Sequence, residues 1–264
     1  MSRRVEIVNS FYDRIDEDVR LNSSRQGQLE YATTMEYIHR YAKSGEKVLE
    51  IGAGTGRYSI ALAKEGYEVK AIELVERNLE VLRKNSSGMK NIDSYQGDAL
   101  HLDRFGENEF DITLLLGPMY HLYDKEHVHK AIEEAIRVTK RDGIILVAFL
   151  SVYAIMNNNY LNGTFAAGMK ENFDENYYVK HFEEQLFTGY DIAEFEQLFE
   201  PHKVQYLTTV AVDNILELAE GRADFKMSED EFELFKKYHL AVCEKRELLG
   251  SASHLLYVCR KEEA

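Results

Sequence analysis

The fold is decided by residues 47–56, Lys-Val-Leu-Glu-Ile-Gly-Ala-Gly-Thr-Gly. The apolar run of Val48, Leu49 and Ile51 is typical of a buried parallel strand, and the glycines after it predict a tight turn. The amphipathic residues 58–64 predict a helix whose amino end points back over the strand tip. Glycine is needed in such a turn because a Cβ atom would obstruct a ligand lying against the backbone. Together these features indicate the first βα unit of a nucleotide- or nucleoside-binding α/β domain.

The spacing of the glycines narrows the class of ligand. A dinucleotide-binding turn has the pattern Gly-x-Gly-x-x-Gly, which would place its third glycine at position 57. That position is Arg57, and the glycines fall instead at positions 52, 54 and 56. A nicotinamide-dependent oxidoreductase is therefore retained only as the weaker alternative.

Two further strand ends carry features of the same kind. Residues 67–73 predict a second strand that ends in Glu73, and in such folds an acidic residue about 20 positions after the glycines binds ribose hydroxyls. Residues 92–96 predict a third strand, which ends in Gly97-Asp98-Ala99. The alternatives are a surface glutamate at position 73 and a turn in which Asp98 caps a short helix.

These three features together resemble the class I S-adenosylmethionine-dependent methyltransferases of the small-molecule type. The resemblance implies a Rossmann-like α/β fold, with a seven-stranded, mostly parallel sheet, an antiparallel last strand and helices on both faces. It also implies that S-adenosyl-L-methionine is the cofactor and S-adenosyl-L-homocysteine the product. By the match of motifs, the methionine part would be held by Glu50, Gly52, Ala53, Gly54, Thr55 and Gly56, the ribose and adenine by Glu73, Leu74, Gly97, Asp98 and Ala99, and the path to the sulfonium would be lined by Leu116 and Gly117.

The rest of the chain follows the same order of elements. We expect strands at 110–116, 144–150, 203–212 and 255–259, helices at 76–84, 124–139 and 191–200, a turn at 140–143, and a mostly helical insertion at 214–249. Residues 151–190 show no clear period and predict a substrate-facing insertion or a small cap. Aromatic residues of this stretch, such as Tyr160, Tyr177 and Tyr178, are candidates for an acceptor pocket, with core packing as the alternative. We divide the single domain into a helical lid (1–45), a cofactor-binding core (46–150) and the second half of the sheet with its insertions (151–264).

The N-terminal region predicts two helices over residues 5–42 with a polar break between them. A helix that packs on the domain and exposes its charges is the plainer interpretation. Members of the resembled family with a similar extension use it as a lid, which would bring Tyr12, Arg20 or Arg25 to the bound molecule.

Methyl transfer depends mainly on positioning and needs a base only when the acceptor must lose a proton. His121 follows the fourth strand and is the candidate base, since an ordinary histidine pKa near 6.5 suits that role. Tyr120 is a candidate for orienting the acceptor, and a purely structural histidine is the alternative at position 121. The segment 117–120, Gly-Pro-Met-Tyr, lacks the Asn/Asp-Pro-Pro-aromatic motif of enzymes that methylate exocyclic base amines.

No metal site is predicted. His121, Asp124, His127 and His129 lie close in sequence, but residues 127 and 129 of one helix point about 200° apart and cannot share an ion.

Composition limits the class of protein and its partners. The 264 residues are 45% apolar and 30% charged, which is typical of a soluble globular protein without a stretch of about 20 apolar residues. A net charge of −14 disfavours nucleic acid as a partner. The polar start and the two isolated cysteines, Cys243 and Cys259, indicate a cytoplasmic protein with reduced thiols. The expected partner is a small-molecule methyl acceptor reacting through oxygen, nitrogen or sulfur. A homodimer and a protein that binds the cofactor without transferring a methyl group are left open.

Overall fold

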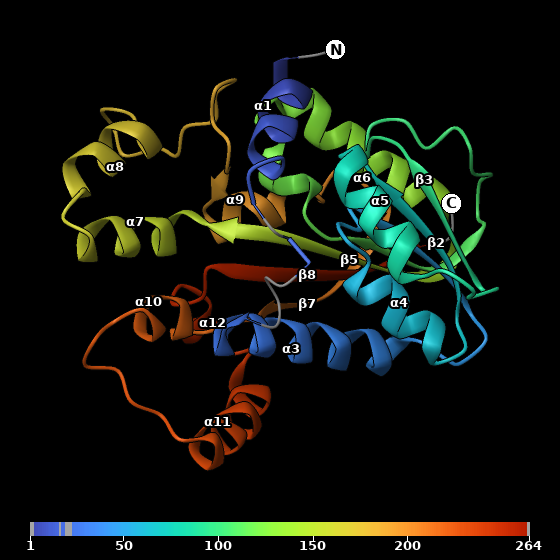
Figure 1. Ribbon diagram of the computed structural model, residues 1–264. Coiled ribbons are helices and arrows are strands. Elements are labelled where there is room, and N and C mark those ends of the chain that lie inside the picture. The colour runs from blue at the N-terminus through green and yellow to red at the C-terminus, as the bar shows by residue number, and fades with distance from the viewer. Residues whose placement is uncertain (1–2, 16, 19–22, 263–264) are drawn as a thin grey trace.

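The computed structural model describes residues 3–15, 17–18 and 23–262. Within these residues one sheet of eight strands forms the centre of the molecule, in the order β3-β2-β1-β4-β5-β8-β7, with β6 beside β5 (Figure 1). The strands are β1 (Lys47–Ile51), β2 (Glu68–Glu73), β3 (Ile92–Gln96), β4 (Phe110–Leu115), β5 (Thr139–Ser151), β6 (Gly189–Tyr190), β7 (Val204–Ala211) and β8 (His254–Lys261).

The sheet is parallel except for β8, which runs antiparallel between β5 and β7. The predicted fold is therefore confirmed, with the two-residue β6 as an eighth strand. Ile51 at the end of β1 lies opposite Ile72 of β2 and Leu115 of β4. Glu73, the last residue of β2, lies opposite Gln96, the last residue of β3. This register brings the carboxyl ends of four strands to one edge of the sheet.

The start of β5 differs from the prediction. Residues 140–143 were expected to form a turn before the strand, but they lie inside it. Thr139 pairs with Phe110 and Ile144 with Ile112, so four residues bulge opposite a single residue of β4. Asp142 adopts a left-handed conformation with φ of 59° in this bulge. The turn-forming residues therefore form a β-bulge within β5 and not a turn before it.

Helices cover both faces of the sheet. On one face lie α6 (Lys125–Val138) and α9 (Ile192–Gln197), and on the other α3 (Arg25–Tyr41), α4 (Arg57–Lys64) and α5 (Glu76–Asn85) (Figure 1). Both faces of a parallel strand are buried, so successive side chains enter different cores. In β5 the first core receives Ile145, Val147 and Phe149, and the second receives Ile144, Leu146 and Ala148.

The remaining helices lie outside this layered core. They are α1 (Arg3–Tyr12), the 3-10 helix η1 (Pro118–His121), α7 (Val152–Leu161), α8 (Phe165–Asn172), α10 (Leu216–Glu220), α11 (Glu229–Val242) and α12 (Arg246–Leu249). The stretch after residue 151, which showed no period, folds into the packed pair α7 and α8 beyond the end of β5 (Figure 1). Across the described ranges, no helix has both the length and the apolar character to cross a membrane.

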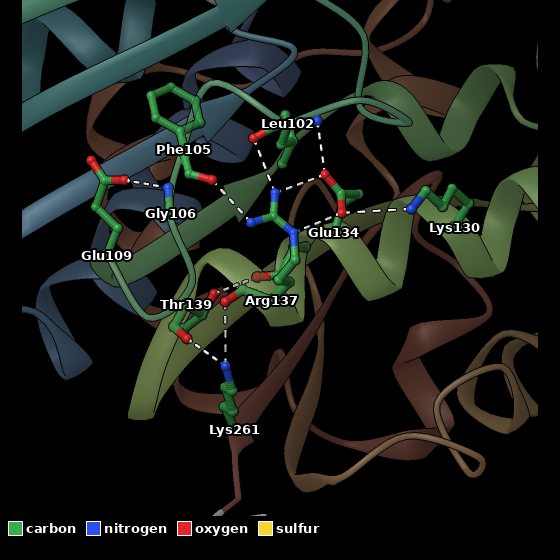
Figure 2. A network of polar contacts seen from close by, with 10 residues as sticks. Leu102, Phe105, Gly106, Glu109, Lys130, Glu134, Arg137, Thr139 and Lys261 are labelled. Atoms are coloured by element: carbon green, nitrogen blue, oxygen red, sulfur yellow. Dashed lines mark hydrogen bonds and ion pairs between the residues drawn. The ribbon is translucent and has the colours of Figure 1, made fainter.

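A polar network on α6 fixes the long connection between β3 and β4 (Figure 2). The Arg137 guanidinium donates to the carbonyl oxygens of Leu102, at 3.0 Å, and Phe105, at 2.9 Å. The Glu134 carboxylate accepts from the Leu102 N–H at 2.8 Å and from Arg137. The Arg137 side chain beside Glu134 lowers the pKa of that carboxyl to about 2. Because the connection begins with Gly97 and Asp98, this network also holds one wall of the site described next.

Candidate active site

A cavity of about 370 Å³ opens at the edge of the sheet where β1, β2 and β4 end. Of the thirteen residues expected to bind the cofactor, twelve line it. They are Glu50, Gly52, Ala53, Gly54, Thr55, Glu73, Leu74, Gly97, Asp98, Ala99, Leu116 and Gly117. The thirteenth, Gly56, lies outside the lining because it packs beneath α5, where a Cβ atom would come within 2.7 Å of Leu82 Cγ.

The glycine turn is pressed against the connection that leaves β4. Gly52 has φ of 82°, and a Cβ atom there would lie 2.6 Å from Pro118 Cδ and 2.7 Å from the Leu116 carbonyl oxygen. Only glycine fits both the backbone conformation and the space. The turn therefore keeps its backbone directly at the cavity wall.

Glu73 fastens the glycine turn to the end of β2. Its Oε2 accepts from the Gly54 N–H at 2.7 Å, and its Oε1 accepts from the Val75 N–H at 2.8 Å. Burial raises the pKa of this carboxyl, while the two backbone N–H groups oppose the rise. Each carboxylate oxygen has a second lone pair, so Glu73 can accept from a diol as well as from the backbone.

Glu50 is a buried acid below the turn. Its carboxyl accepts a hydrogen bond from the Ser59 hydroxyl of α4. Burial raises its pKa to about 8, so the group is mostly protonated at pH 7. A cation placed beside it would favour the charged form and lower this pKa.

Asp98 pairs with a residue that the sequence did not single out. Arg4 of α1 is buried and forms an ion pair with the Asp98 carboxylate. The other oxygen of Asp98 accepts from the Leu100 N–H at 3.1 Å, which is a turn contact of the kind expected as the alternative. An amino group bound at Asp98 would share the carboxylate with Arg4.

Helix α1 covers the cavity through Arg4, Val8, Phe11 and Tyr12. The Tyr12 hydroxyl lies 3.2 Å from His121 Nε2. Of the three residues expected to contact the bound molecule from the N-terminal region, Tyr12 is thus at the cavity, and Arg20 lies outside the described residues.

The structure places Arg25 elsewhere, which corrects the third lid contact. Its guanidinium donates to the Met227 carbonyl oxygen and to Glu229, at 2.5 Å, and lies 5.5 Å from the Phe232 ring centroid. Arg25 therefore joins α3 to α11, because the Met227 carbonyl just before that helix and the Glu229 and Phe232 side chains within it all contact the guanidinium.

His121 is buried, and its ring orientation is fixed. Nδ1 lies 2.6 Å from the Leu186 carbonyl oxygen, so Nδ1 carries the proton and Nε2 is the acceptor. Burial lowers the pKa of His121 to about 4, and the nearby Arg4 charge adds to the decrease. The expectation of an ordinary histidine pKa is therefore wrong, and His121 is a weak base in this environment.

The second half of the cavity is built from elements far apart in sequence. Glu30 of α3, Leu150 of β5, Phe187, Glu217 of α10 and His254 of β8 line it, together with Tyr120. The order β5-β8-β7 explains this convergence, because the antiparallel β8 starts where β5 and β7 end. The sequence gives no local motif for these residues.

The aromatic residues of 151–190 do not form the expected acceptor wall as a group. The side chains of Tyr160, Tyr177 and Tyr178 are each more than 70% exposed. Phe187 is the residue from the end of this stretch that lines the cavity.

Comparison with known proteins agrees with this geometry. Residues 48–143 match the family model described as a methyltransferase domain. The demethylmenaquinone methyltransferase of Clavibacter sepedonicus is 32% identical over 152 residues, covering 57% of this chain and 58% of that protein. The glycine/sarcosine N-methyltransferase of Parasynechococcus marenigrum is 27% identical over 145 residues, covering 54% of this chain and 50% of that protein. The chain spans about half the length of the curated relatives it matches.

Solved structures extend the likeness in fold to the whole chain. Phosphoethanolamine N-methyltransferase 1 of Haemonchus contortus, solved with phosphoethanolamine and S-adenosylhomocysteine, has a TM-score of 0.62 at 16% identity. The alignment covers 100% of this chain and 50% of that one. At this level of identity the likeness concerns the fold.

Proposed function

Since the chain carries a methyltransferase domain of the S-adenosylmethionine-dependent, Rossmann-like kind over residues 48–143, we propose that it transfers a methyl group from S-adenosylmethionine to a small-molecule acceptor. The observation that carries the proposal is the convergence of three strand ends on one cavity. The turn after β1, Glu73 at the end of β2 and Asp98 after β3 all line it.

The residues of the cavity fit the proposed cofactor. In this proposal Glu73 accepts hydrogen bonds from two ribose hydroxyls and Asp98 from the amino group of adenine, because both carboxylates line the cavity. Leu74, Val75 and Ala99 offer apolar surface for the purine ring. Glu50 lies on the side of the glycine turn, where it would balance the positive charge of the methionine part.

The cofactor supplies a methyl group on a positively charged sulfur, which any aligned nucleophile can attack. The protein then has to hold the acceptor in line and keep water away, and positioning of this kind can supply most of the acceleration. Helix α1 serves both purposes in the proposal, because Val8, Phe11 and Tyr12 close the cavity from above.

The names of the relatives support small molecules as the acceptor class, because they include a demethylmenaquinone and a glycine/sarcosine methyltransferase. The net charge of −14 further disfavours a polyanionic acceptor.

The proposal is tested by incubating the protein with S-adenosylmethionine labelled in the methyl group and a panel of small amines, phenols and thiols. Label should appear in at least one acceptor, with an equal amount of S-adenosylhomocysteine formed. A protein that binds S-adenosylhomocysteine tightly but labels no member of the panel would support the alternative of a non-catalytic binding protein.

A further inference from the structure

The second half of the cavity, where we expect the acceptor to bind and which we call the acceptor half, is acidic. Seven carboxyl residues line the whole cavity, against two arginines. Of the seven, five belong to the cofactor half: Glu50, Glu73, Asp98, Glu17 beside Gly54, and Asp18, which accepts from Asn85 of α5. Arg4 is paired there with Asp98. Glu30 and Glu217 remain at the acceptor half, in a space that would repel an anionic acceptor and attract a cationic one.

A partly buried chain of hydrogen-bonded side chains lies behind this surface. The Asp213 side chain is fully buried at the end of β7, and its Oδ2 lies 2.7 Å from His254 Nδ1. The Gln26 amide donates to Asp213 Oδ2 at 3.0 Å and to Glu30 Oε2 at 3.4 Å. The chain Glu30–Gln26–Asp213–His254 thus joins α3 to the ends of β7 and β8.

The Asp213 carboxylate fixes the tautomer of the neutral His254 ring. A carboxylate only accepts hydrogen bonds, so Nδ1 carries the proton and Nε2 is the nitrogen that can take another. The two rings therefore have different partners: the His254 ring contacts the fully buried Asp213 carboxylate, whereas the His121 ring contacts the Leu186 carbonyl oxygen. The Tyr120 ring lies 5.8 Å from the His254 ring, which links this imidazole to the segment that leaves β4.

The same residues are a poor metal site. Asp213, Glu217 and His254 have ligand atoms within 4.8 Å of one another. However, Asp213 Oδ1 accepts from the backbone N–H groups of Ser253 and His254, while Oδ2 accepts from Gln26 and the His254 ring. His254 Nδ1 donates a proton to this contact, so it cannot ligate an ion at the same time.

We propose that the acceptor is a small molecule with a protonated amino group, that this ammonium binds between Glu30 and Glu217, and that His254, positioned by Asp213, takes its proton. The inference rests on the proposed function and specifies its acceptor. An N–H bond of the ammonium breaks and its proton moves to His254 Nε2. The electron pair left on nitrogen forms the new N–CH3 bond, the C–S bond breaks, and its electron pair stays on sulfur. The products are the methylated amine in its protonated, ammonium form, neutral S-adenosylhomocysteine and a proton held on His254, so the two positive charges of the reactants are conserved.

The first test compares acceptors of equal shape and different charge. We expect methylation of 2-phenylethylamine or 2-aminoethanol, and at least tenfold slower methylation of 2-phenylethanol or ethane-1,2-diol. Calorimetry on the protein saturated with S-adenosylhomocysteine should show tighter binding of the amine in each pair. Equal rates and equal affinities for amines and alcohols would overturn the inference while leaving methyl transfer itself established. If no acceptor of any class is labelled, the proposed function fails first.

The second test removes the base and its positioning residue. In His254→Gln, kcat should fall about 100-fold at pH 7, which is the lower range for a general base. Below the pKa of the amine, the remaining rate should rise about tenfold per pH unit, because only the neutral amine then reacts. Asp213→Asn should show the same steep rise of the rate with pH, with a smaller loss of kcat. The groups that face His254 and enter its pH profile are Asp213 from the segment after β7, Glu217 from α10, Tyr120 from η1 and, through Gln26, Glu30 from α3.

Matched controls keep this test specific. His127→Gln, at an exposed site on α6, should leave kcat and the pH profile unchanged. Glu217→Gln should raise KM for amines about tenfold with little change in kcat, whereas Glu233→Gln on the exposed side of α11 should not. All variants should bind S-adenosylhomocysteine as the wild type does, which shows that they are folded. A His254→Gln variant with the wild-type pH profile, or activity lost on EDTA treatment and restored by Mg²⁺, would overturn the inference.

Discussion

Substitution of Gly52 by alanine tests whether the glycine turn is held as tightly as its geometry indicates. A left-handed backbone costs a non-glycine residue about 1–2 kcal/mol. The new Cβ atom would also lie 2.6 Å from Pro118 Cδ and 2.7 Å from the Leu116 carbonyl oxygen. Both neighbours are rigid, because one belongs to a proline ring and the other to the backbone. Overpacking of this kind costs about 1–3 kcal/mol more. The total loss in free energy of unfolding should be about 2–5 kcal/mol.

Gly45 offers the matched control, since its φ is 88° and a Cβ atom there would meet nothing within 4 Å. Gly45→Ala should cost only the backbone part, so the two variants should differ by about 2 kcal/mol. Urea unfolding measures both, and a slope unchanged from wild type would show that the midpoints report stability. Gly52→Ala should also weaken S-adenosylhomocysteine binding, whereas Gly45→Ala should not. Equal destabilisation by the two substitutions would refute the tight contact between the turn and Pro118.

Three further predictions follow from individual side chains. Glu73→Ala should weaken S-adenosylhomocysteine binding about 10- to 100-fold by calorimetry, because hydrogen bonds to a charged group contribute about 1.5–3 kcal/mol; an unchanged dissociation constant would remove Glu73 from the site. Glu134→Gln should destabilise the protein at pH 7 and progressively less as the pH falls from about 4.5 towards 2, because the lowered pKa of Glu134 contributes stability only while the group is ionised. Urea unfolding at pH 7 and pH 3 checks this, and a constant difference between variant and wild type would contradict it. His121 has a pKa of about 4 in the folded protein, so protonation of the unfolded chain should lower wild-type stability between pH 6.5 and 4; His121→Gln should lose less stability over this range, and an equal loss would show that His121 is not buried as a neutral ring.

The core of the fold could be predicted because its signals are local. The strands β1, β4 and β5 each contain a short apolar run, and β2 and β3 are marked by the Glu73 and Gly97-Asp98 that end or follow them. Parallel packing then brings those ends to one edge without further information. For this reason twelve of the thirteen residues expected to bind the cofactor line one cavity, while their contacts with a cofactor stay a prediction.

The contacts that could not be predicted join positions far apart in sequence. Arg4 pairs with Asp98 across 94 positions, and Arg25 contacts Glu229 across 204. Nothing near Arg25 distinguishes a lid residue from one that joins two helices. Asp213 and His254 meet because β8 returns antiparallel between β5 and β7.

The pKa values of individual side chains could not be predicted from the sequence either, because they depend on burial. The sequence gives Glu50 and His121 ordinary acid and base strengths, but desolvation raises the pKa of Glu50 to about 8 and lowers that of His121 to about 4. The sequence therefore located His121 beside the cavity, but its weakness as a base depends on the helix and loop that cover it.

The central claim is that the ends of β1, β2 and β3 bind one adenosine-bearing molecule. The most direct measurement is a calorimetric titration of the protein with S-adenosylhomocysteine, followed by thermal or urea unfolding at 100 times the measured dissociation constant. We predict one binding site per chain and a stabilisation of about 2.7 kcal/mol, with no effect of NADH under the same conditions. Binding of NADH without binding of S-adenosylhomocysteine would contradict the account.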